Sequence, residues 1–294
     1  FSDDLNTTSQ EVEVSISNVN DNDPVITSSG SFAVPENQQS VATLTATDAD
    51  NDNLTFSISG GDSTDLEITD SGVLSLKNNP NFEVKNNYSF TASVTDGVYT
   101  ASTPITVNIS DVNEVPAFGA LAGEISANEN INSTLTTITA SDEDGDTLSY
   151  SLTGDDSSSL SIDSFGNVSF KASPDFEIPS DLNEDNIYSF AVIANDGSLS
   201  ATSSNILVAI NNLNDNAPTF VDLSTNVEVT NGQTNVFDIS TTDADGDDIT
   251  LSKAGTDGSV FSISDSGNLS FTSAPDFANP TDNDGDNIYK LSIV

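Results

Sequence analysis

The sequence lacks several residue types on which common kinds of protein chemistry depend. Its 294 residues include no cysteine, histidine, methionine or tryptophan. Without cysteine there are no disulfide bonds and no thiol chemistry, and without cysteine and histidine a zinc or copper site is chemically unfavourable. The ordinary catalytic triads need one of the same two residues. We therefore expect no enzyme, because the carboxylates that remain recur as repeated sets rather than as one active site.

Positive charge is also scarce. Five lysines and no arginine stand against 47 acidic residues, which gives a formal net charge of -42. Such a chain repels nucleic-acid phosphates and acidic lipids, and it attracts cations. We therefore expect no nucleic acid among its partners. Solubility or adaptation to a salty medium is an alternative explanation of this charge.

Long apolar runs are missing as well. No run approaches the 18 residues of a membrane-spanning helix, so we expect no membrane insertion within this sequence. No signal peptide precedes the chain, which begins at Phe1, and we expect it to be a window from a longer protein. Apolar residues still make up 35% of the chain and alternate with polar ones, which argues against disorder.

What the sequence does contain is a repeat. An acidic string begins at Asp48 ("DADNDNLTFSI"), Asp142 ("DEDGDTLSYSL") and Asp243 ("DADGDDITLSK"), so it returns after 94 and then 101 residues. Two further strings recur in step with it: "NFE", "DFE" and "DFA" at Asn81, Asp175 and Asp276, and an aromatic strand at Tyr88, Tyr188 and Tyr289. Between these two strings the second and third copies carry a longer loop. The chain is therefore built from tandem units.

Within each unit the apolar residues alternate with polar ones, as half-buried strands require. Gly, Asn and Asp fill the gaps, and no stretch has a helical period. About seven strands in roughly 90 residues are typical of an immunoglobulin-like sandwich. We predict an all-β chain of tandem seven-stranded sandwich domains in an elongated array. The predicted divisions are 1–20 (the end of a preceding repeat, with Val12, Val14 and Ile16 in its last strand), 21–113 (repeat 1), 114–215 (repeat 2) and 216–294 (repeat 3, stopping inside its sixth strand).

An ordered set of motifs in each unit resembles the cadherin repeat family, in particular the cadherin-like repeats of large bacterial surface adhesins. Repeat 1 has "PEN" at Pro35, "DAD" at Asp48, "NFE" at Asn81 and "DG" at Asp96. The string "NNLNDNAPTF" (211–220) is similar to the family's "DxNDNxPxF" linker, and related strings lie at 18–26 and 111–118. Repeat 3 departs from the pattern, because Asn231 and Ala278 stand where the family has its early and later glutamates.

The resemblance implies calcium bound at the junctions between repeats. Calcium takes 6 to 8 oxygen ligands from carboxylates, carbonyls and amide side chains. At the first junction the implied ligands are Asn20, Asp21, Asn22, Asp48, Asp50 and Asp96. At the second they are Glu36, Glu83, Asp111, Asn113, Glu114, Asp142, Asp144 and Asp196. At the third they are Glu129, Asp175, Glu177, Asn214, Asp215, Asn216, Asp243 and Asp245.

The implied function is that of a calcium-rigidified stalk in a cell-surface adhesin, serving cell adhesion from an extracellular position. Its partners would be calcium and other cell-surface or matrix components, with homophilic contacts as one option. A carbohydrate-binding or extracellular-matrix module of a secreted acidic protein is the alternative. That role usually needs aromatic platforms, whereas Tyr88, Tyr188 and Tyr289 fall on core-like positions.

Two acidic loops lie outside the family pattern. The strings "DADGDD" and "TDNDGDN" resemble the first half of an EF-hand loop. The candidate ligands are Asp243, Asp245 and Asp247 in one loop and Asp282, Asp284 and Asp286 in the other, with Asp181, Asn183 and Asp185 as a weaker copy in repeat 2. No glutamate follows at the twelfth position. The alternatives are an additional calcium site or a solvated acidic turn.

Overall fold

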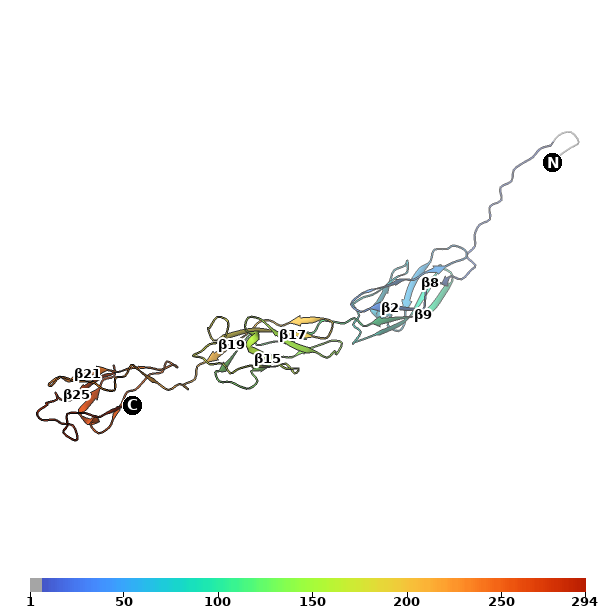
Figure 1. The fold of residues 1–294 in the computed structure, drawn as a ribbon. Helices are drawn as coiled ribbons and strands as arrows, with labels where there is room; N and C mark the ends of the chain where they lie inside the picture. Colours follow the sequence, from blue (N-terminus) through green and yellow to red (C-terminus); the bar gives the residue numbers. More distant parts are fainter. Residues whose placement is uncertain (1–6) are drawn as a thin grey trace. The chain divides into compact units, whose positions relative to one another are not determined.

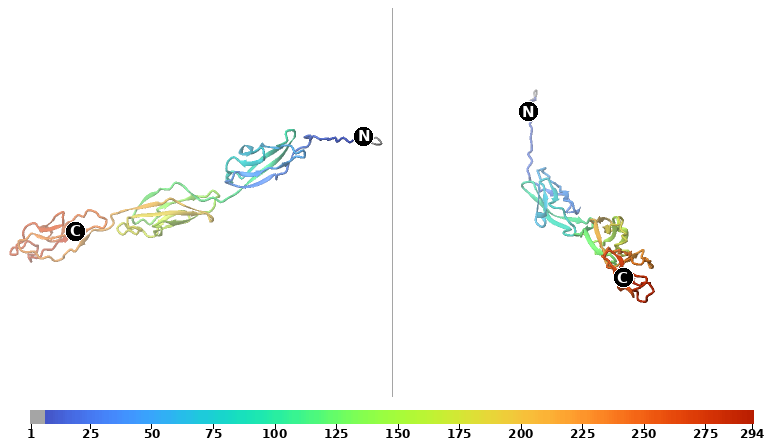
Figure 2. Two further views of the ribbon diagram at one scale, coloured as in Figure 1. Left: turned by 90° about the horizontal axis from the view of Figure 1, so that it is seen from above. Right: turned by 90° about the vertical axis from the view of Figure 1, so that its left-hand side faces the viewer.

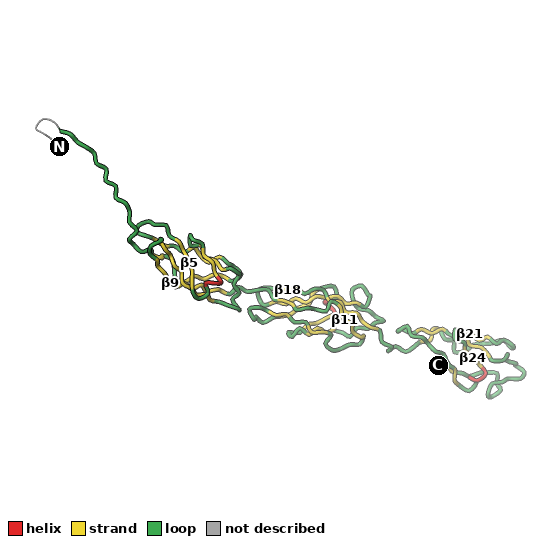
Figure 3. Tube along the Cα trace, turned by 180° about the vertical axis from the view of Figure 1, so that it is seen from behind, coloured by secondary structure: helices red, strands yellow, loops and turns green. Residues whose placement is uncertain are grey.

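The computed structural model describes residues 7–294, and its secondary structure is strand and loop apart from three short turns (Figure 3). These turns are the 3-10 helices η1 (Ser63–Asp65), η2 (Ser157–Ser159) and η3 (Gly258–Val260). In the part of the chain that the structure describes, no helix has the length and apolar character needed to cross a membrane. The prediction of an all-β chain is confirmed.

The chain divides into two compact units. Unit 1 holds the described residues up to Pro116 together with Asp142–Thr147, and unit 2 holds Ala117–Ser141 and Leu148–Val294. The boundaries predicted for the individual repeats stay a prediction, although none of the described sheets crosses them.

Unit 1 contains the strands of residues 25–110. They are β1 (Val25–Ile26), β2 (Ser31–Pro35), β3 (Ser40–Thr43), β4 (Ala46–Thr47), β5 (Thr55–Ser59), β6 (Leu66–Ile68), β7 (Val73–Leu76), β8 (Asn87–Thr95) and β9 (Thr100–Ser110). One sheet has the order β2-β9-β8-β5 and a second has the order β3-β7-β6, while β1 pairs with β4. The strands β2, β9 and β8 lie side by side in Figure 1, and both views in Figure 2 show this part as one body.

The core of unit 1 lies between these sheets and follows the predicted period of two. In β8 every second side chain is buried, and Phe90, Ala92 and Val94 are among them. In β9 the side chains of Ile105 and Val107 are buried in the same alternating way. This strand pairs in parallel with β2. Burial of such side chains stabilises the sandwich by about 1.5–3 kcal/mol each.

Unit 2 repeats this plan in its first part. The strands are β10 (Ala117–Phe118), β11 (Glu124–Asn128), β12 (Thr136–Thr137), β13 (Ala140–Ser141), β14 (Ser149–Thr153), β15 (Leu160–Ile162), β16 (Asn167–Phe170), β17 (Ile187–Asn195), β18 (Ser200–Thr202) and β19 (Ile206–Asn211). Again the first long strand pairs in parallel with the last, β11 with β19, and β12-β16-β15 form the second sheet.

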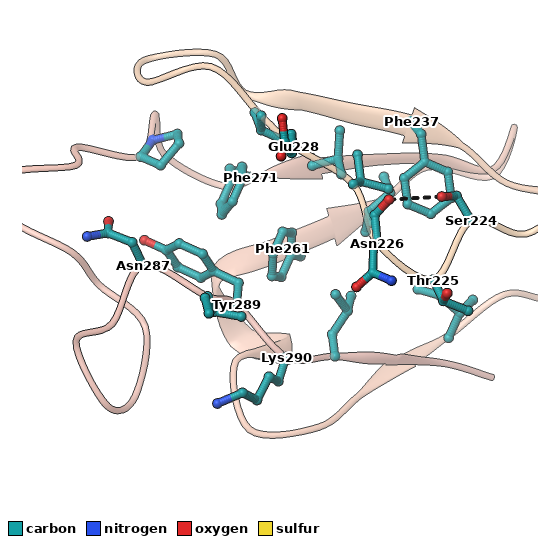
Figure 4. Close-up of a pocket in the computed structure, with 18 of the residues that line it drawn as sticks. Ser224, Thr225, Asn226, Glu228, Phe237, Phe261, Phe271, Asn287, Tyr289 and Lys290 are labelled. Atoms are coloured by element: carbon teal, nitrogen blue, oxygen red, sulfur yellow. Dashed lines mark hydrogen bonds between the residues drawn. The ribbon is translucent and has the colours of Figure 1, made fainter.

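The last part of unit 2 has fewer long strands. They are β20 (Thr219–Val221), β21 (Asn235–Asp238), β22 (Ser240–Thr242), β23 (Lys253–Ala254), β24 (Phe261–Ile263), β25 (Asn268–Phe271) and β26 (Ser292–Ile293). Tyr88 and Tyr188 pair with residues of β9 and β19, and no described strand of residues 216–294 takes that place. A cavity of about 1300 Å³ opens there, and Phe261, Phe271 and Tyr289 line it (Figure 4).

One predicted strand is wrong. Val12, Val14 and Ile16 lie in a segment, residues 8–19, to which the structure assigns no strand, and their side chains are 75%, 82% and 94% exposed. A strand needs a hydrogen-bonding neighbour, and the alternation alone does not provide one. Residues 1–6 of the same predicted element lie outside the described part.

Candidate metal centres

One buried glutamate fixes the chain around each of two linkers, Glu36 at 111–118 and Glu129 at 211–220. Glu36 follows β2 and is 2% exposed. Its Oε1 accepts the N–H of Val112 in the linker at 2.9 Å, and its Oε2 accepts the N–H of Phe82 in the "NFE" turn at 2.9 Å. Glu129 makes the same two bonds in unit 2. In residues 216–294 the amide of Asn231 takes over half of this role, since its Oδ1 accepts the N–H of Phe277.

The residue after each of these positions must adopt a left-handed conformation. Asn37 and Asn130 have φ of 62° and 60°, and Gly232 has φ of 82°. Asparagine and glycine are the residues that tolerate this region best. The requirement explains the "EN" of the motif in physical terms, and it confirms that Asn231 stands where the other repeats have glutamate.

The linker 2 cluster comprises Glu36, Glu83, Asp111, Asn113, Glu114, Asp142 and Asp144, all within unit 1. Oxygens of Glu36, Glu83 and Asp111 lie within 4.8 Å of one another, and so do oxygens of Glu83, Glu114 and Asp144. The N–H of Glu114 donates to Asp144 Oδ2 at 2.9 Å, which holds the linker against the acidic loop. Glu36, Glu83, Asp111, Glu114 and Asp144 are therefore brought together, and their role as metal ligands stays a prediction.

The electrostatics of the linker 2 cluster are unfavourable to carboxylates. Burial raises the pKa of Glu114, and the charges of Glu36 and Asp144 raise it further. Burial also raises the pKa of Asp111, followed by its contact with Asp144. Both directions mean that the ionised forms lack enough positive partners.

The linker 1 cluster comprises Asn20, Asp21, Asn22, Asp48, Asp50, Asp52 and Asp96. Asp50 Oδ2 accepts the N–H groups of Asp21 and Asn22 at 3.0 and 2.8 Å. These two bonds join the linker to the acidic loop, and within that loop Asp48 Oδ1 accepts the N–H of Asp50 at 2.8 Å. Oxygens of Asp48, Asp50 and Asp52 lie within 4.8 Å of one another.

The linker 3 cluster lies in unit 2 and comprises Glu129, Glu177, Asn214, Asp215, Asn216, Asp243 and Asp245. Oxygens of Glu129, Glu177 and Asp215 approach within 4.8 Å. The amide of Asn216 donates to Glu177 Oε2 at 3.1 Å and to Asp245 Oδ1 at 2.9 Å. Burial raises the pKa of Glu177, and the charges of Glu129 and Asp245 add to that effect.

Two predicted ligands, Asp175 and Asp196, accept hydrogen bonds from the turns that follow them. Asp175 Oδ1 accepts the N–H groups of Glu177 and Ile178, so it shapes the turn that presents Glu177. Asp196 Oδ1 accepts the N–H groups of Ser198 and Leu199 at 2.6 Å, and it belongs to unit 2. A place for Asp196 in the linker 2 cluster stays a prediction.

Asp52 was missing from the predicted ligands, whereas Asp247 was predicted only as a ligand of the EF-hand-like loop. Asp52 joins Asp48 and Asp50, and Asp247 joins Asp243 and Asp245, each within 4.8 Å. Both are the third acid of a D-x-D-x-D spacing, which is the signal that identifies them. The family motif covers only the first two acids and so hides the third.

The hydrogen bonding of the clusters fits a calcium ion independently of the sequence motif. Several of their buried oxygens accept no hydrogen bond, namely Asn20 Oδ1, Asp48 Oδ2, Asp52 Oδ2, Asp96 Oδ2, Glu114 Oε2, Asp142 Oδ2, Asp144 Oδ1 and Glu177 Oε1. A buried oxygen without a partner costs about 1–3 kcal/mol, and more when it is charged. All of these atoms are carboxylate or amide oxygens, which are the ligands that calcium prefers.

The fold and these clusters define a class of protein, namely tandem β-sandwich repeats with oxygen-rich linkers. Residues 30–110 match the cadherin domain family. The chain is 37% identical over 148 residues to the Fat-like cadherin-related tumor suppressor homolog of Drosophila melanogaster, which is 47% of this chain and 3% of that relative. It is 30% identical over 236 residues to Cadherin-2 of Mus musculus, 70% of this chain and 26% of the relative.

A solved structure supports the same fold. The crystal structure of mouse cadherin-23 EC22-24 is similar with a TM-score of 0.67 and 20% identity, over 88% of this chain and 90% of that chain. Residues 30–110 therefore belong to the cadherin domain family, and most of the chain shares the fold of cadherin repeats. The chain spans only 3% and 26% of the length of the two relatives named above.

Proposed function

We propose that this chain is a calcium-binding segment of a cell-surface or extracellular adhesion protein. The match of residues 30–110 to the cadherin domain family supports a role in cell adhesion. In this proposal calcium fills the three linker clusters and fixes each repeat against the next, as in the stalk of an adhesin. The proposed partners are calcium and other cell-surface or matrix components, including further copies of the chain.

The observation that carries the proposal is the set of buried, unpartnered oxygens in the linker clusters. Two carboxylates about 4 Å apart repel each other by roughly 4 kcal/mol at an effective dielectric of 20. A divalent cation would turn that repulsion into attraction. The linker would then be held by its own ligands, and each repeat would keep its own core.

The carbohydrate-binding alternative has no comparable support. Tyr88 and Tyr188 are 9% and 1% exposed, and the ring of Tyr289 packs edge-on against Phe271 at 4.9 Å. These rings belong to the cores of the sandwiches. An aromatic platform for sugar binding would need exposed faces.

Calorimetric titration of the metal-free chain with calcium tests the proposal. We expect saturable uptake, and we expect the variant Glu177→Gln with Asp245→Asn to lose about tenfold or more in affinity at the linker 3 cluster, because two ligand charges are removed. The control is Asp70→Asn with Asp265→Asn, which removes two exposed charges outside the clusters. An absence of saturable uptake by the unmodified chain would overturn the proposal.

A further inference from the structure

The loop between β25 and β26 contains a buried acid that the linker clusters do not explain. Asp282 is 8% exposed. Its Oδ2 accepts the N–H of Asp286 at 2.8 Å, but its Oδ1 has no hydrogen-bond partner. A carboxylate oxygen in this position calls for a donor or a cation.

The loop is held in place by a second buried acid. Asp257 is 5% exposed and lies at the start of η3. Its Oδ1 accepts the N–H of Asn283, and its Oδ2 accepts the N–H of Lys290, both at 2.7 Å. The two ends of the loop are therefore fixed, and the unpartnered oxygen of Asp282 belongs to an anchored segment.

The same loop gathers further negative charge and already draws one cation. The pKa of Asp284 is lowered first by a hydrogen bond from Lys290, and contacts with the side chains of Asp282 and Asp286 also lower it. Lys290 Nζ lies 3.1 Å from Asp284 Oδ2 and 4.0 Å from Asp286 Oδ2. One ammonium thus contacts two carboxylates of this loop, and none of its contacts is with Asp282.

The equivalent places in the other repeats are satisfied in different ways. In residues 181–186 both oxygens of Asp181 accept backbone N–H groups, from Asp185 and Asn186. In unit 1 the loop is shorter and holds no counterpart of Asp282, and Lys85 Nζ contacts Asp62, the counterpart of Asp257, at 2.6 Å. The contrast singles out Asp282 as the buried loop acid with an unused oxygen.

We propose that Asp282, Asp284 and Asp286 form a calcium site within one repeat, separate from the linker clusters. The three acids occupy positions 1, 3 and 5 of the loop, as in the first half of an EF-hand. At position 6, where that loop makes its sharp turn, Asn287 has φ of 60°. The donor set contains only oxygen, which suits calcium rather than a transition metal.

Lys290 competes with calcium for one oxygen of this site. Its ammonium occupies Asp284 Oδ2, so calcium has to compete with it. The residue of repeat 2 that corresponds to Lys290 is Ser189. The N–H of Ser189 donates to Asp156, as the N–H of Lys290 donates to Asp257. The variant Lys290→Ser therefore removes the competing charge without a foreign residue.

Amide resonances of the full chain, followed by NMR during titration with calcium chloride, test the site directly. We expect the amides of Asn283, Gly285 and Asn287 to titrate. Asp284→Asn should abolish those shifts and leave the amide of Asn216 in the linker 3 cluster titrating. Because Asp284 is exposed, this variant should fold. Lys290→Ser should tighten binding in the loop by about threefold, from loss of one nearby positive charge.

The control and the contrary outcomes are separate from those of the proposed function. Asp265→Asn, an exposed acid in the same repeat, should change neither set of shifts. Loop amides that do not move by about 10 mM calcium, above the range of weak extracellular calcium modules, would overturn this site alone. Loop amides that titrate while the linker amides stay fixed would support this site and overturn the proposed function.

Discussion

Neighbouring carboxylates of one motif are in opposite electrostatic states. The pKa of Asp50 is lowered, first by the hydrogen bond from the Asn22 side chain and then, against the effect of burial, by backbone N–H groups. The pKa of Asp52 is raised, first by burial and then by the charges of Asp48 and Asp50. Asp50 therefore holds the linker by accepting hydrogen bonds. The ionised form of Asp52 lacks such partners, and a bound cation or a proton would stabilise it.

These directions predict how the stability of the metal-free chain depends on pH. Acids with a raised folded-state pKa, such as Asp52, Asp111 and Glu114, destabilise the fold when ionised. Lowering the pH from 7 should therefore raise the melting temperature, and this gain should be complete below their ordinary values of 3.8 and 4.5. Acids with a lowered pKa, such as Asp50, should lose stabilisation only below 3.8. Thermal melts of calcium-stripped protein measure both limbs.

The matched variant for this prediction is Asp52→Asn, which removes one acid of the raised group. Asp52→Asn should reduce the rise in melting temperature between pH 7 and the ordinary aspartate pKa of 3.8, whereas Asp70→Asn should not. With calcium present the slope should reverse, because protons then compete with the metal. A melting temperature that falls steadily from pH 7 in the stripped protein contradicts the assignment.

At this scale the sequence predicts the recurring acids and misses their local partners. Glu36, Glu129 and Asp144 recur in register with the repeat, so spacing alone identifies them. It cannot reveal that both oxygens of Glu36 accept backbone N–H groups, or that Lys290 lies over Asp284, since both depend on loop conformations.

Among the elements, one turn is repeated in all three sandwiches. Gly72, Gly166 and Gly267 have φ of 89°, 80° and 84°, and a Cβ on Gly166 would lie 1.9 Å from the carbonyl oxygen of Ile138. Their own carbonyl oxygens accept the N–H groups of Leu44, Ile138 and Ile239. The hairpin thus packs directly on the neighbouring strand, and no side chain fits between them.

We expect Gly166→Ala to destabilise the β15–β16 hairpin by at least about 2 kcal/mol, because it adds a backbone clash to the strain of positive φ. Hydrogen exchange at the amides of Ile162 and Val168 measures the local loss. Gly197→Ala is the control, since its φ is 106° but no atom lies within 4 Å of the added Cβ. It should cost only about 1–2 kcal/mol. Equal effects of the two changes are incompatible with the clash.

Strand existence is more predictable than strand limits. The alternation in Tyr88–Val94 predicts β8 correctly, because one face of that strand is buried along its whole length. Residues 40–47, by contrast, do not form one strand, because β3 pairs with β7 whereas β4 pairs with β1. Such a switch between sheets depends on a distant partner, which local periodicity does not record.

For the whole molecule, the proposed linker sites predict a change in stiffness rather than in core stability. Small-angle scattering of the chain in excess calcium should give a larger maximum dimension than in EDTA, because bound ligands restrict the linkers. Sodium chloride at matched ionic strength should not reproduce the change. It screens the repulsion between exposed charges that lie beyond a Debye length of about 8 Å, but screening does not join the two sides of a linker. Equal scattering in calcium and EDTA would contradict a stiffened stalk.

The parallel pairing of β2 with β9, and of β11 with β19, places the entry and the exit of each of these sandwiches in a fixed relation. The linker 2 and linker 3 clusters each combine acids of two consecutive copies with those of the linker between them. A duplication of one full period taken from repeats 1 and 2 would therefore recreate a complete junction, because the new copy brings both halves of its ligand set. A copy of residues 216–294 would not, since Asn231 and Ala278 replace the two glutamates.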